Sequence, residues 1–519
     1  QAPGTTLGLM VVADAGVDDN DINMMTSGYI YVYGQGGEAY IDDGAKLLVI
    51  PQMPDSGVKY GYYGGYAFLR AETISGEYDE VASASPFFDV EAWPDPNNGY
   101  EGDDDLYWVG LTRDFALPAA TDNERSVANA LNALYEGTED EEVVDYLNRF
   151  LVCGGAPGGS SDLLDDLGGL VHTTSAVAVL TGLNQYYGTL TDRMGGVVAG
   201  GPGGLGFAPM MGPMFAQNSD ATASDAGRQL MTAGSLPSAV KDDTQWGLWT
   251  KVFGSFGEDD GDDIASQYDY DTYGITIGFD KKIGAQSLLG VSIGYAVTDT
   301  EMDKVDEDLD VDSYQAALYG VYNPDPWYVA GILSYDINDY ESDRRIRLTG
   351  EKLDADYDGS TISGYVEGGY NWWITKTFSI IPLASLQVSY LETDSFHEKG
   401  GPSALDVDDN DYTSVVSTLG FRMRKEFVTA GGSRFIPEFR ARWAHEFGDD
   451  DFSAKAAFVN APLAKFTVEG DDPEDDAALL GVGFTAILMK NLSLYVDYDA
   501  NLAGDFTEHT GALGLRFRW

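Results

Sequence analysis

The sequence is short of cysteine and histidine. Its 519 residues include one cysteine, Cys153, and four histidines. A single cysteine excludes an intramolecular disulfide, a CxxC redox pair and a cysteine-based zinc site, and so few histidines argue against a histidine-rich metal centre. No GxSxG nucleophile motif and no Ser/His/Asp set stands out. We therefore expect no catalytic residues, no cofactor and no metal, and a chain that is not an enzyme.

Positive charge is scarce as well. Only 30 Lys and Arg residues oppose 85 Asp and Glu residues, which gives a net charge of −55. Such a chain cannot neutralise a phosphate backbone with a clustered basic surface, so the charge balance excludes a nucleic-acid-binding protein. It also argues against contact with anionic lipid through a polybasic patch.

Long apolar runs are missing too. No stretch reaches the roughly 18 uninterrupted apolar residues that a membrane-spanning helix requires. The start, Gln1-Ala2-Pro3-Gly4, shows no charged segment followed by an apolar one, as a signal peptide would. We expect that a leader has been removed or that the chain begins inside a longer precursor.

The C-terminal half is dominated by alternation of apolar residues with small or polar ones. The segment 273–279 (YGITIGF) is an example. A period of two places one apolar face on each strand. Most runs have about ten residues or more, the length of a tilted strand across a bilayer. The twelve predicted strands lie near 245–256, 270–280, 286–298, 311–322, 327–338, 358–372, 377–391, 412–426, 434–447, 477–488, 492–501 and 509–519.

The links between these strands alternate in length. The short ones are 281–285, 323–326, 373–376, 427–433 and 489–491. The mostly long, acidic ones are 257–269, 299–310, 339–357, 392–411, 448–476 and 502–508. All long links therefore lie on one side of the sheet, as in an outer-membrane barrel, and only a closed barrel pairs every strand within lipid. A soluble sandwich would not sort its loops this way. We predict an all-β fold, a 12-stranded antiparallel transmembrane β-barrel.

Two regions of different character open the chain. Residues 1–118 contain short β-type runs broken by glycines and acids, which suggest a solenoid or a sandwich. Residues 119–171 show helical spacing of apolar residues, first in 123–135 and again in 141–151. We expect a small β-domain followed by a helical segment.

A third helical stretch leads to the barrel. Helical spacing continues through 172–194, and a run rich in Gly, Pro, Met and Ala at 195–243 predicts a linker before the barrel of 244–519. The apolar stripe of the predicted helix consists of Leu180, Leu183, Tyr187 and Leu190.

Several segments of the barrel region are similar to the autotransporter (type V secretion) family, whose members secrete a passenger through their own C-terminal barrel. They are 249–254 (WTKVFG), 382–390 (PLASLQVSY), 437–447 (PEFRARWAHEF) and 480–498. The resemblance covers about 123–519. Residues 123–134 resemble the helix that precedes such barrels, and 66–118 resemble the last turns of a passenger β-helix. Asp475-Asp476 replaces an arginine common in the family, so we expect the outer hairpin near 453–467 to be tethered differently.

The resemblance implies a translocator and outer-membrane anchor that exports and displays its own N-terminal passenger. It also implies a helix threaded through the barrel lumen. The 23 residues of 172–194 suit this role, because at 1.5 Å each they span ~35 Å of a barrel ~25–30 Å tall. Implied partners are outer-membrane lipid, the barrel-assembly machinery, periplasmic chaperones and the passenger. The alternatives are a surface structural or adhesive protein that works through 1–118, and an outer-membrane hydrolase, which lacks a nucleophile motif.

Three groups of residues are candidate sites. Gly514, Phe517 and Trp519 resemble the assembly signal of outer-membrane barrels, although an ordinary last strand with interfacial aromatics would look the same. Strand parity points a basic set into the lumen, where it would hold the helix and let a passenger pass, or simply fill the lumen with salt bridges. That set is Arg422, Arg424, Arg440, Arg442, Arg516 and Arg518, with Glu367, Glu438, Asp497 and Asp499 as partners.

The third group is acidic. The runs 259–263, 408–411, 449–451 and 471–472 offer oxygen ligands to divalent cations such as calcium, although solvated loops are the simpler interpretation. His445 and Glu446 are adjacent on a predicted strand, so they face opposite sides and do not form an acid/base pair.

Overall fold

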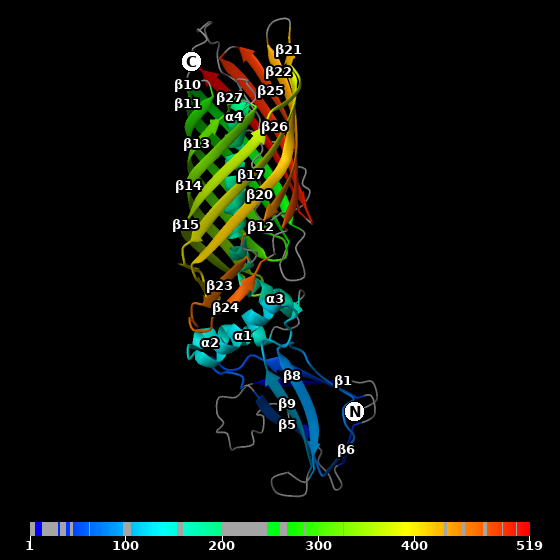
Figure 1. The fold of residues 1–519 in the computed structure, drawn as a ribbon. Helices are drawn as coiled ribbons and strands as arrows, with labels where there is room; N and C mark the ends of the chain where they lie inside the picture. The colour runs from blue at the N-terminus through cyan, green and yellow to red at the C-terminus, as the bar shows by residue number, and fades with distance from the viewer. Residues whose placement is uncertain are drawn as a thin grey trace.

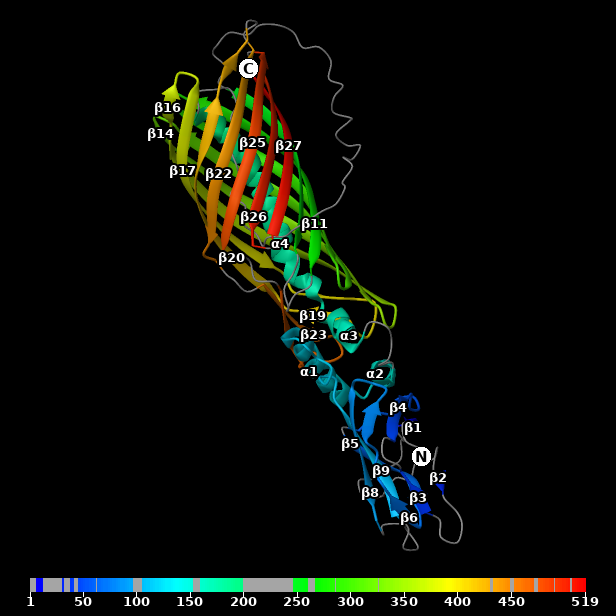
Figure 2. The same ribbon diagram turned by 90° about the vertical axis from the view of Figure 1, so that its right-hand side faces the viewer.

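The computed structural model extends from an N-terminal β-region through a group of helices to a long barrel (Figures 1 and 2). It describes residues 6–12, 30–31, 38–41, 45–61, 63–96, 105–152, 159–198, 246–259, 267–284, 286–324, 326–429, 433–448, 452–470, 475–489, 491–504 and 506–519. The predicted linker 195–243 lies outside these residues, except for its first four positions, which continue a helix.

Within the described residues, twelve long antiparallel strands form the barrel. They are β10 (Trp246–Asp259), β11 (Tyr268–Ile283), β12 (Ser287–Met302), β13 (Asp306–Tyr322), β14 (Trp327–Ile346), β15 (Glu351–Tyr370), β17 (Phe378–Thr393), β20 (Asn410–Lys425), β22 (Arg434–Glu446), β25 (Asp476–Met489), β26 (Leu492–Ala503) and β27 (Phe506–Arg518). Each strand pairs with its neighbours in this series, and β10 pairs with β27 to close the ring. Short strands β16 (Trp372–Thr375) and β21 (Phe427–Val428) pair with β17 and β22. The predicted twelve-stranded antiparallel barrel is confirmed.

The barrel is apolar outside and polar inside. On β14, Leu333, Tyr335 and Ile337 are exposed, whereas the intervening Ser334 and Asp336 are buried. This is the inverse of a soluble sheet, because the outer face of a membrane barrel meets lipid. Exposed aromatic residues border this belt on both sides. They include Tyr273, Tyr295, Tyr314 and Tyr335 on the long-loop side, and Tyr322 and Trp327 on the short-turn side.

Several strands continue beyond the apolar belt, and this corrects the predicted links. β14 ends at Ile346 and β15 begins at Glu351, so most of the predicted link 339–357 is strand. The predicted link 299–310 is likewise mostly strand, and in 502–508 the described residues are strand except for Gly504. The period of two persists there, but its outward positions carry carboxylates, because this part of the barrel projects into water.

A helix occupies the interior of the barrel. The 3₁₀ helix η1 (Leu170–Thr174) leads into α4 (Ser175–Val198), which lies inside the ring of strands and packs against β10–β14 (Figures 1 and 2). The predicted helix 172–194 is therefore present, with a 3₁₀ start and a longer end. Among the described residues, no single helix combines the length and hydropathy needed to cross a membrane, whereas the bent pair 162–168 and 170–195 does.

The long-loop end of the barrel is covered by what we call the outer sheet. Its four strands are β18 (Phe396–His397), β19 (Leu405–Val407), β23 (Ser453–Phe458) and β24 (Phe466–Glu469). Helix α1 (Asp122–Gly137) packs against β23, β24 and α3 (Gly159–Gly168). Helix α2 (Glu141–Val152) follows α1 and contacts β4. The predicted helical segment thus lies between the barrel and the N-terminal strands.

The N-terminal region consists of short strands in several ladders. They are β1 (Thr6–Val12), β2 (Ile30–Tyr31), β3 (Glu38–Tyr40), β4 (Lys46–Gln52), β5 (Tyr63–Ala71), β6 (Thr73–Ser75), β7 (Glu80–Ser83), β8 (Phe88–Asp95) and β9 (Asp105–Arg113). Parallel pairing joins β1 to β4 and β4 to β7, β2 to β5, and β3 to β6. Antiparallel pairing joins β5 to β9 and β9 to β8. Leu47, Val49 and Phe68 are among the buried core residues.

Candidate functional site

The barrel lumen is the candidate site. One glutamine of α4, Gln185, contacts three residues of the barrel wall. The Gln185 Nε2 amide lies 3.2 Å from Ser255 Oγ, 2.9 Å from Glu508 Oε1 and 2.9 Å from Thr510 Oγ1. These residues come from β10 and β27, the two strands that close the barrel. The helix is therefore attached to the closing seam itself.

Other polar contacts join the helix to several more strands of the barrel wall. They are Tyr186 with Ser292 (2.7 Å), Tyr187 with Ser334 (3.0 Å), Thr189 with Thr276 (3.1 Å) and Asn184 with Gln387 (3.0 Å). Of the predicted stripe, Leu180, Leu183 and Leu190 are fully buried, and Tyr187 uses its hydroxyl on the wall. Sequence reasoning missed the polar members, because a polar residue on a helix ordinarily indicates the solvent side.

Ion pairs hold the C-terminal end of the helix, which lies nearest the short turns. Arg193 contacts Asp280 through Nε and Nη2, at 2.5 and 2.7 Å. Lys251 of β10 pairs with Asp192 of the helix and, at 3.1 Å, with Asp497 of β26. All five side chains are buried. Buried charges are costly unless paired, so these contacts favour one position of the helix.

The predicted basic set lies mainly on β20 and β22, away from the strands against which α4 packs. Five of its arginines are buried, and Arg518 is half-buried. The predicted carboxylates lie among them, with Glu438 next to Arg422, Arg424 and Arg440. The pairs are Arg424–Glu438 (2.9 Å), Arg422–Glu438 (3.5 Å), Arg440–Glu438 (3.6 Å), Arg440–Asp497 (3.1 Å), Arg440–Asp499 (2.7 Å), Arg422–Glu367 (3.8 Å), Arg442–Glu367 (3.9 Å) and Arg516–Asp280 (3.8 Å).

The C-terminal residues belong to β27, which pairs with β10 to close the barrel. Gly514 lies opposite Lys251, and Phe517 lies opposite Leu248. Trp519 follows the strand, and its ring is partly exposed near Phe279, with ring centroids 6.1 Å apart. The candidate assembly signal is thus part of the strand that completes the barrel.

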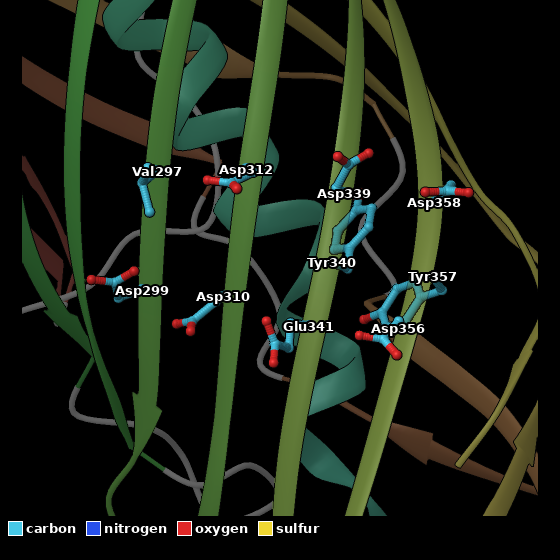
Figure 3. A pocket seen from close by; sticks show the side chains of 10 residues that line it. All are labelled: Val297, Asp299, Asp310, Asp312, Asp339, Tyr340, Glu341, Asp356, Tyr357 and Asp358. Atoms are coloured by element: carbon cyan, nitrogen blue, oxygen red, sulfur yellow. The ribbon is translucent and has the colours of Figure 1, made fainter. Parts of the chain in front are cut away.

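Beyond the apolar belt, the outward face carries rows of carboxylates. Asp271, Asp299, Asp310, Glu341 and Asp356 lie directly opposite one another on successive strands β11–β15. Figure 3 shows several of them beside a depression of about 370 Å³. Like charges that face each other across strands are destabilising. Burial and the neighbouring carboxylates raise the pKa of Asp299 and of Asp310.

A second row lies one step further from the belt. It consists of Asp269, Glu301, Asp308, Asp343 and Asp354. Of the predicted acidic runs, 260–263, 449–451 and 471–472 lie outside the described residues, and Asp408 pairs with Lys465 at 2.6 Å. In the described part of the chain, no group of three or more His, Cys, Asp or Glu residues is arranged to hold a metal ion.

His445 and Glu446 lie on opposite faces of β22. The His445 ring lies on the outside, 2.9 Å from Asp476 Oδ1. Glu446 is buried and accepts hydrogen bonds from the Ser414 hydroxyl and the Val415 amide, both at 2.6 Å. The two side chains serve different surroundings and do not share a site.

Comparison with known proteins gives a family match for the barrel region. Residues 248–499 match the family model described as the autotransporter beta-domain. An extracellular serine protease of Serratia marcescens is 24% identical over 462 residues, which cover 86% of this chain and 42% of that protein. Esterase EstA of Pseudomonas aeruginosa is 26% identical over 280 residues, covering 52% and 42% respectively. The chain thus spans less than half the length of these relatives.

Solved structures give similar matches. The translocator domain of autotransporter NalP from Neisseria meningitidis aligns with a TM-score of 0.44 and 14% identity, over 56% of this chain and 92% of that one. The β-domain of the Bordetella autotransporter BrkA aligns with a TM-score of 0.41 and 19% identity, over 53% and 99%.

Proposed function

Because the barrel at residues 248–499 belongs to the autotransporter β-domain family, we propose that this chain exports, anchors and displays its own N-terminal passenger. The barrel lies in the outer membrane and is a translocator, not an enzyme. Residues 1–118 are the end of the passenger, 119–169 the segment outside the barrel, and 170–198 the helix that plugs the lumen after export.

The path of the chain through the barrel is the main observation that supports this proposal. Helix α4 starts beneath the outer sheet, where η1 contacts β23 and β24. It ends near the short turns, where Arg193 meets Asp280 close to the end of β11. The described residues before η1 therefore lie on the long-loop side, whereas β10 starts on the short-turn side. A single chain reaches this arrangement if its N-terminal part has crossed the barrel.

The segment next to the barrel is docked rather than free, which supports display. The Asn123 side chain of α1 exchanges two hydrogen bonds with the backbone of Glu469 in β24, at 2.7 and 2.8 Å. The Tyr146 hydroxyl of α2 contacts both Glu351 and Ser403 at the barrel's outer end. Burial and the neighbouring Glu351 raise the pKa of Tyr146, so its hydroxyl stays protonated and can donate.

The strands before residue 118 support a β-helix-like passenger end. Three parallel ladders, β1-β4-β7, β2-β5 and β3-β6, repeat in chain order. Such stacking of successive turns is typical of a solenoid. The antiparallel strands β9 and β8 then extend the sheet beyond β5, and Arg113 at the end of β9 contacts Asn132 of α1 at 2.9 Å.

The partners of this function follow from the same assignment. The exposed apolar belt fits outer-membrane lipid. Gly514, Phe517 and Trp519 on the closing strand fit capture by the barrel-assembly machinery through strand addition. Periplasmic chaperones would protect the unpaired strands before closure. The basic luminal set would provide a charged path for the passenger.

Display in intact cells tests the proposal. The chain is expressed behind a secretion leader with an epitope tag before Gln1, and antibody binding to whole cells is measured. We expect strong labelling from the full chain and none from a variant that lacks 246–519. Equal labelling of both would contradict a translocator role for the barrel. A structural or adhesive role of 1–118 would appear as cell aggregation or surface binding that depends on those residues.

A further inference from the structure

A buried charge cluster lies at the outer mouth of the barrel, centred on Arg344 of β14. Its guanidinium contacts Glu307 of β13 at 3.0 Å through Nε, and Glu398 at 2.9 and 3.1 Å through Nη1. Its Nη2 donates to the carbonyl of Asp166 in α3 at 2.9 Å. Arg344, Glu307 and Glu398 are almost completely buried. One side chain therefore joins two barrel strands, the loop that carries the outer sheet, and the segment outside the barrel.

The two glutamates also bind the segment that enters the lumen. Glu307 accepts the Val171 amide at 2.9 Å. Glu398 contacts His172 Nε2 at 2.8 Å and accepts the Leu405 amide at 2.9 Å. Both oxygens of each carboxylate are thus used. The cluster therefore contacts the start of η1 as well as the strands.

Close packing around the cluster depends on a glycine. Gly169 connects α3 to η1 with a φ of 70°. A Cβ at this position would lie 2.8 Å from Leu405 Cδ1 and 2.9 Å from Arg344 Nη1. Any other residue would be strained and would push the guanidinium away from the turn. The chain therefore bends sharply against Arg344 just before it enters the barrel.

Aromatic rings shield one side of the cluster. Tyr340 stacks on Tyr357 with centroids 4.7 Å apart, Tyr357 stacks on Phe396 at 3.9 Å, and Phe396 meets the His172 ring at 4.9 Å. Burial alone would raise the pKa of Glu398, but Arg344 and His172 hold it at about 2. The carboxylate therefore remains charged, and its attraction to Arg344 is strengthened by the exclusion of water.

We infer that Arg344 is a latch that closes the outer mouth around the helix once the passenger has left. This inference rests on the proposed export function. A passenger moving outward would occupy the place of Val171 and His172, so the cluster forms only after passage. Export then does not require Arg344, whereas closure does. Without the guanidinium, two buried carboxylates would lose their shared partner, which strongly disfavours the closed mouth.

Hydrogen exchange on the full chain in detergent tests the latch. Arg344→Gln is compared with Arg345→Gln, its neighbour on the opposite face, which is half exposed and pairs with Asp306 only at 3.7 Å. We expect Arg344→Gln to speed exchange about tenfold or more in 166–174 and 396–407 together. Exchange in 180–194, deep in the lumen, should stay slow. Arg345→Gln should match the unmodified chain.

Surface labelling of intact cells completes the test. Arg344→Gln should display its tag as the unmodified chain does, because export precedes closure of the mouth, and it should still exclude a bulky hydrophilic antibiotic, because α4 remains in the lumen. Unchanged exchange at the mouth would overturn the latch, even if display succeeds. A loss of display in Arg344→Gln, with the barrel folded, would also overturn it. If Arg344→Gln does not assemble, Glu307→Gln, which keeps the shape, must show the same local opening. Failure of the unmodified chain to display its tag would instead contradict the export function.

Discussion

Arg193 of the luminal helix and Asp280 of β11 form a two-point ion pair inside the barrel, with Nε and Nη2 at 2.5 and 2.7 Å from the carboxylate oxygens. Asp280 also accepts a hydrogen bond from the Tyr319 hydroxyl at 3.1 Å. The pair holds the end of the helix nearest the short turns, opposite the end held by Arg344. The helix is therefore fixed at both mouths of the barrel.

Replacing Arg193 should loosen the inner end of the helix. Arg193→Met leaves a buried carboxylate without its main partner, which costs about 3 kcal/mol. We expect a lower melting temperature of the folded barrel and more frequent opening in single-channel records. Lys282→Gln, an exposed change two residues along from Asp280, serves as the control. Equal melting temperatures for the two variants would show that the ion pair does not hold the helix.

The carboxylate rows predict stability that depends on pH. Burial and neighbouring acids raise the pKa of Asp271, Asp299 and Asp310 above the ordinary value near 4. The folded state therefore binds protons more tightly than the unfolded state. Stability should fall as the pH rises from the ordinary value through the raised pKa values. We expect a higher melting temperature at pH 4, close to the ordinary pKa, than at pH 7, and a gain from added salt or calcium at pH 7.

A single neutral substitution isolates the effect of the rows. Asp310→Asn removes the central charge of five and should stabilise the protein by roughly 0.5–1 kcal/mol at pH 7. Glu139→Gln, an exposed change outside the rows, should have no such effect. Destabilisation by Asp310→Asn at pH 7 would contradict repulsion across the strands and would indicate that the rows are held together by bound cations.

Loss of the last strand should prevent assembly. Deleting 506–519 leaves β10 and β26 as open edges. Lipid offers no hydrogen-bonding partners to the unpaired backbone N–H and C=O groups of these edges. We expect the deleted chain to be degraded in the periplasm, and Trp519→Ala to lower the yield in the outer membrane. The check is an immunoblot of membrane fractions. A normal surface yield of the deleted chain would show that closure by β27 is dispensable.

Periodicity predicted the barrel because outward residues such as Ile275 and Ile293 meet lipid and alternate with small ones. It failed beyond the belt, where Asp299 and Glu341 replace them and resemble a solvated loop. The apolar stripe through Leu180 predicted the helix. The contacts of this helix with the barrel wall depend on which strands surround it. A local sequence pattern does not indicate which strands these are.

The Arg344 cluster had no signal in the sequence. Its members Glu307, Arg344 and Glu398 are separated by dozens of residues, and each lies in a segment predicted to be a loop. Only the closed barrel brings them together. The luminal arginines were foreseeable because strand parity alone points them inward, whereas their pairing with particular carboxylates required the register of the strands.

Planar-bilayer conductance tests most directly whether the helix fills the barrel. The full chain is compared with a variant that lacks 119–243. We expect small or flickering conductance from the full chain and a larger, steadier pore from the variant, because water can wet the polar luminal wall. The variant should also melt at a lower temperature, since Leu180 and Leu183 each lose roughly 1.5–3 kcal/mol of burial. Unchanged conductance together with an unchanged melting temperature would contradict a helix inside the barrel.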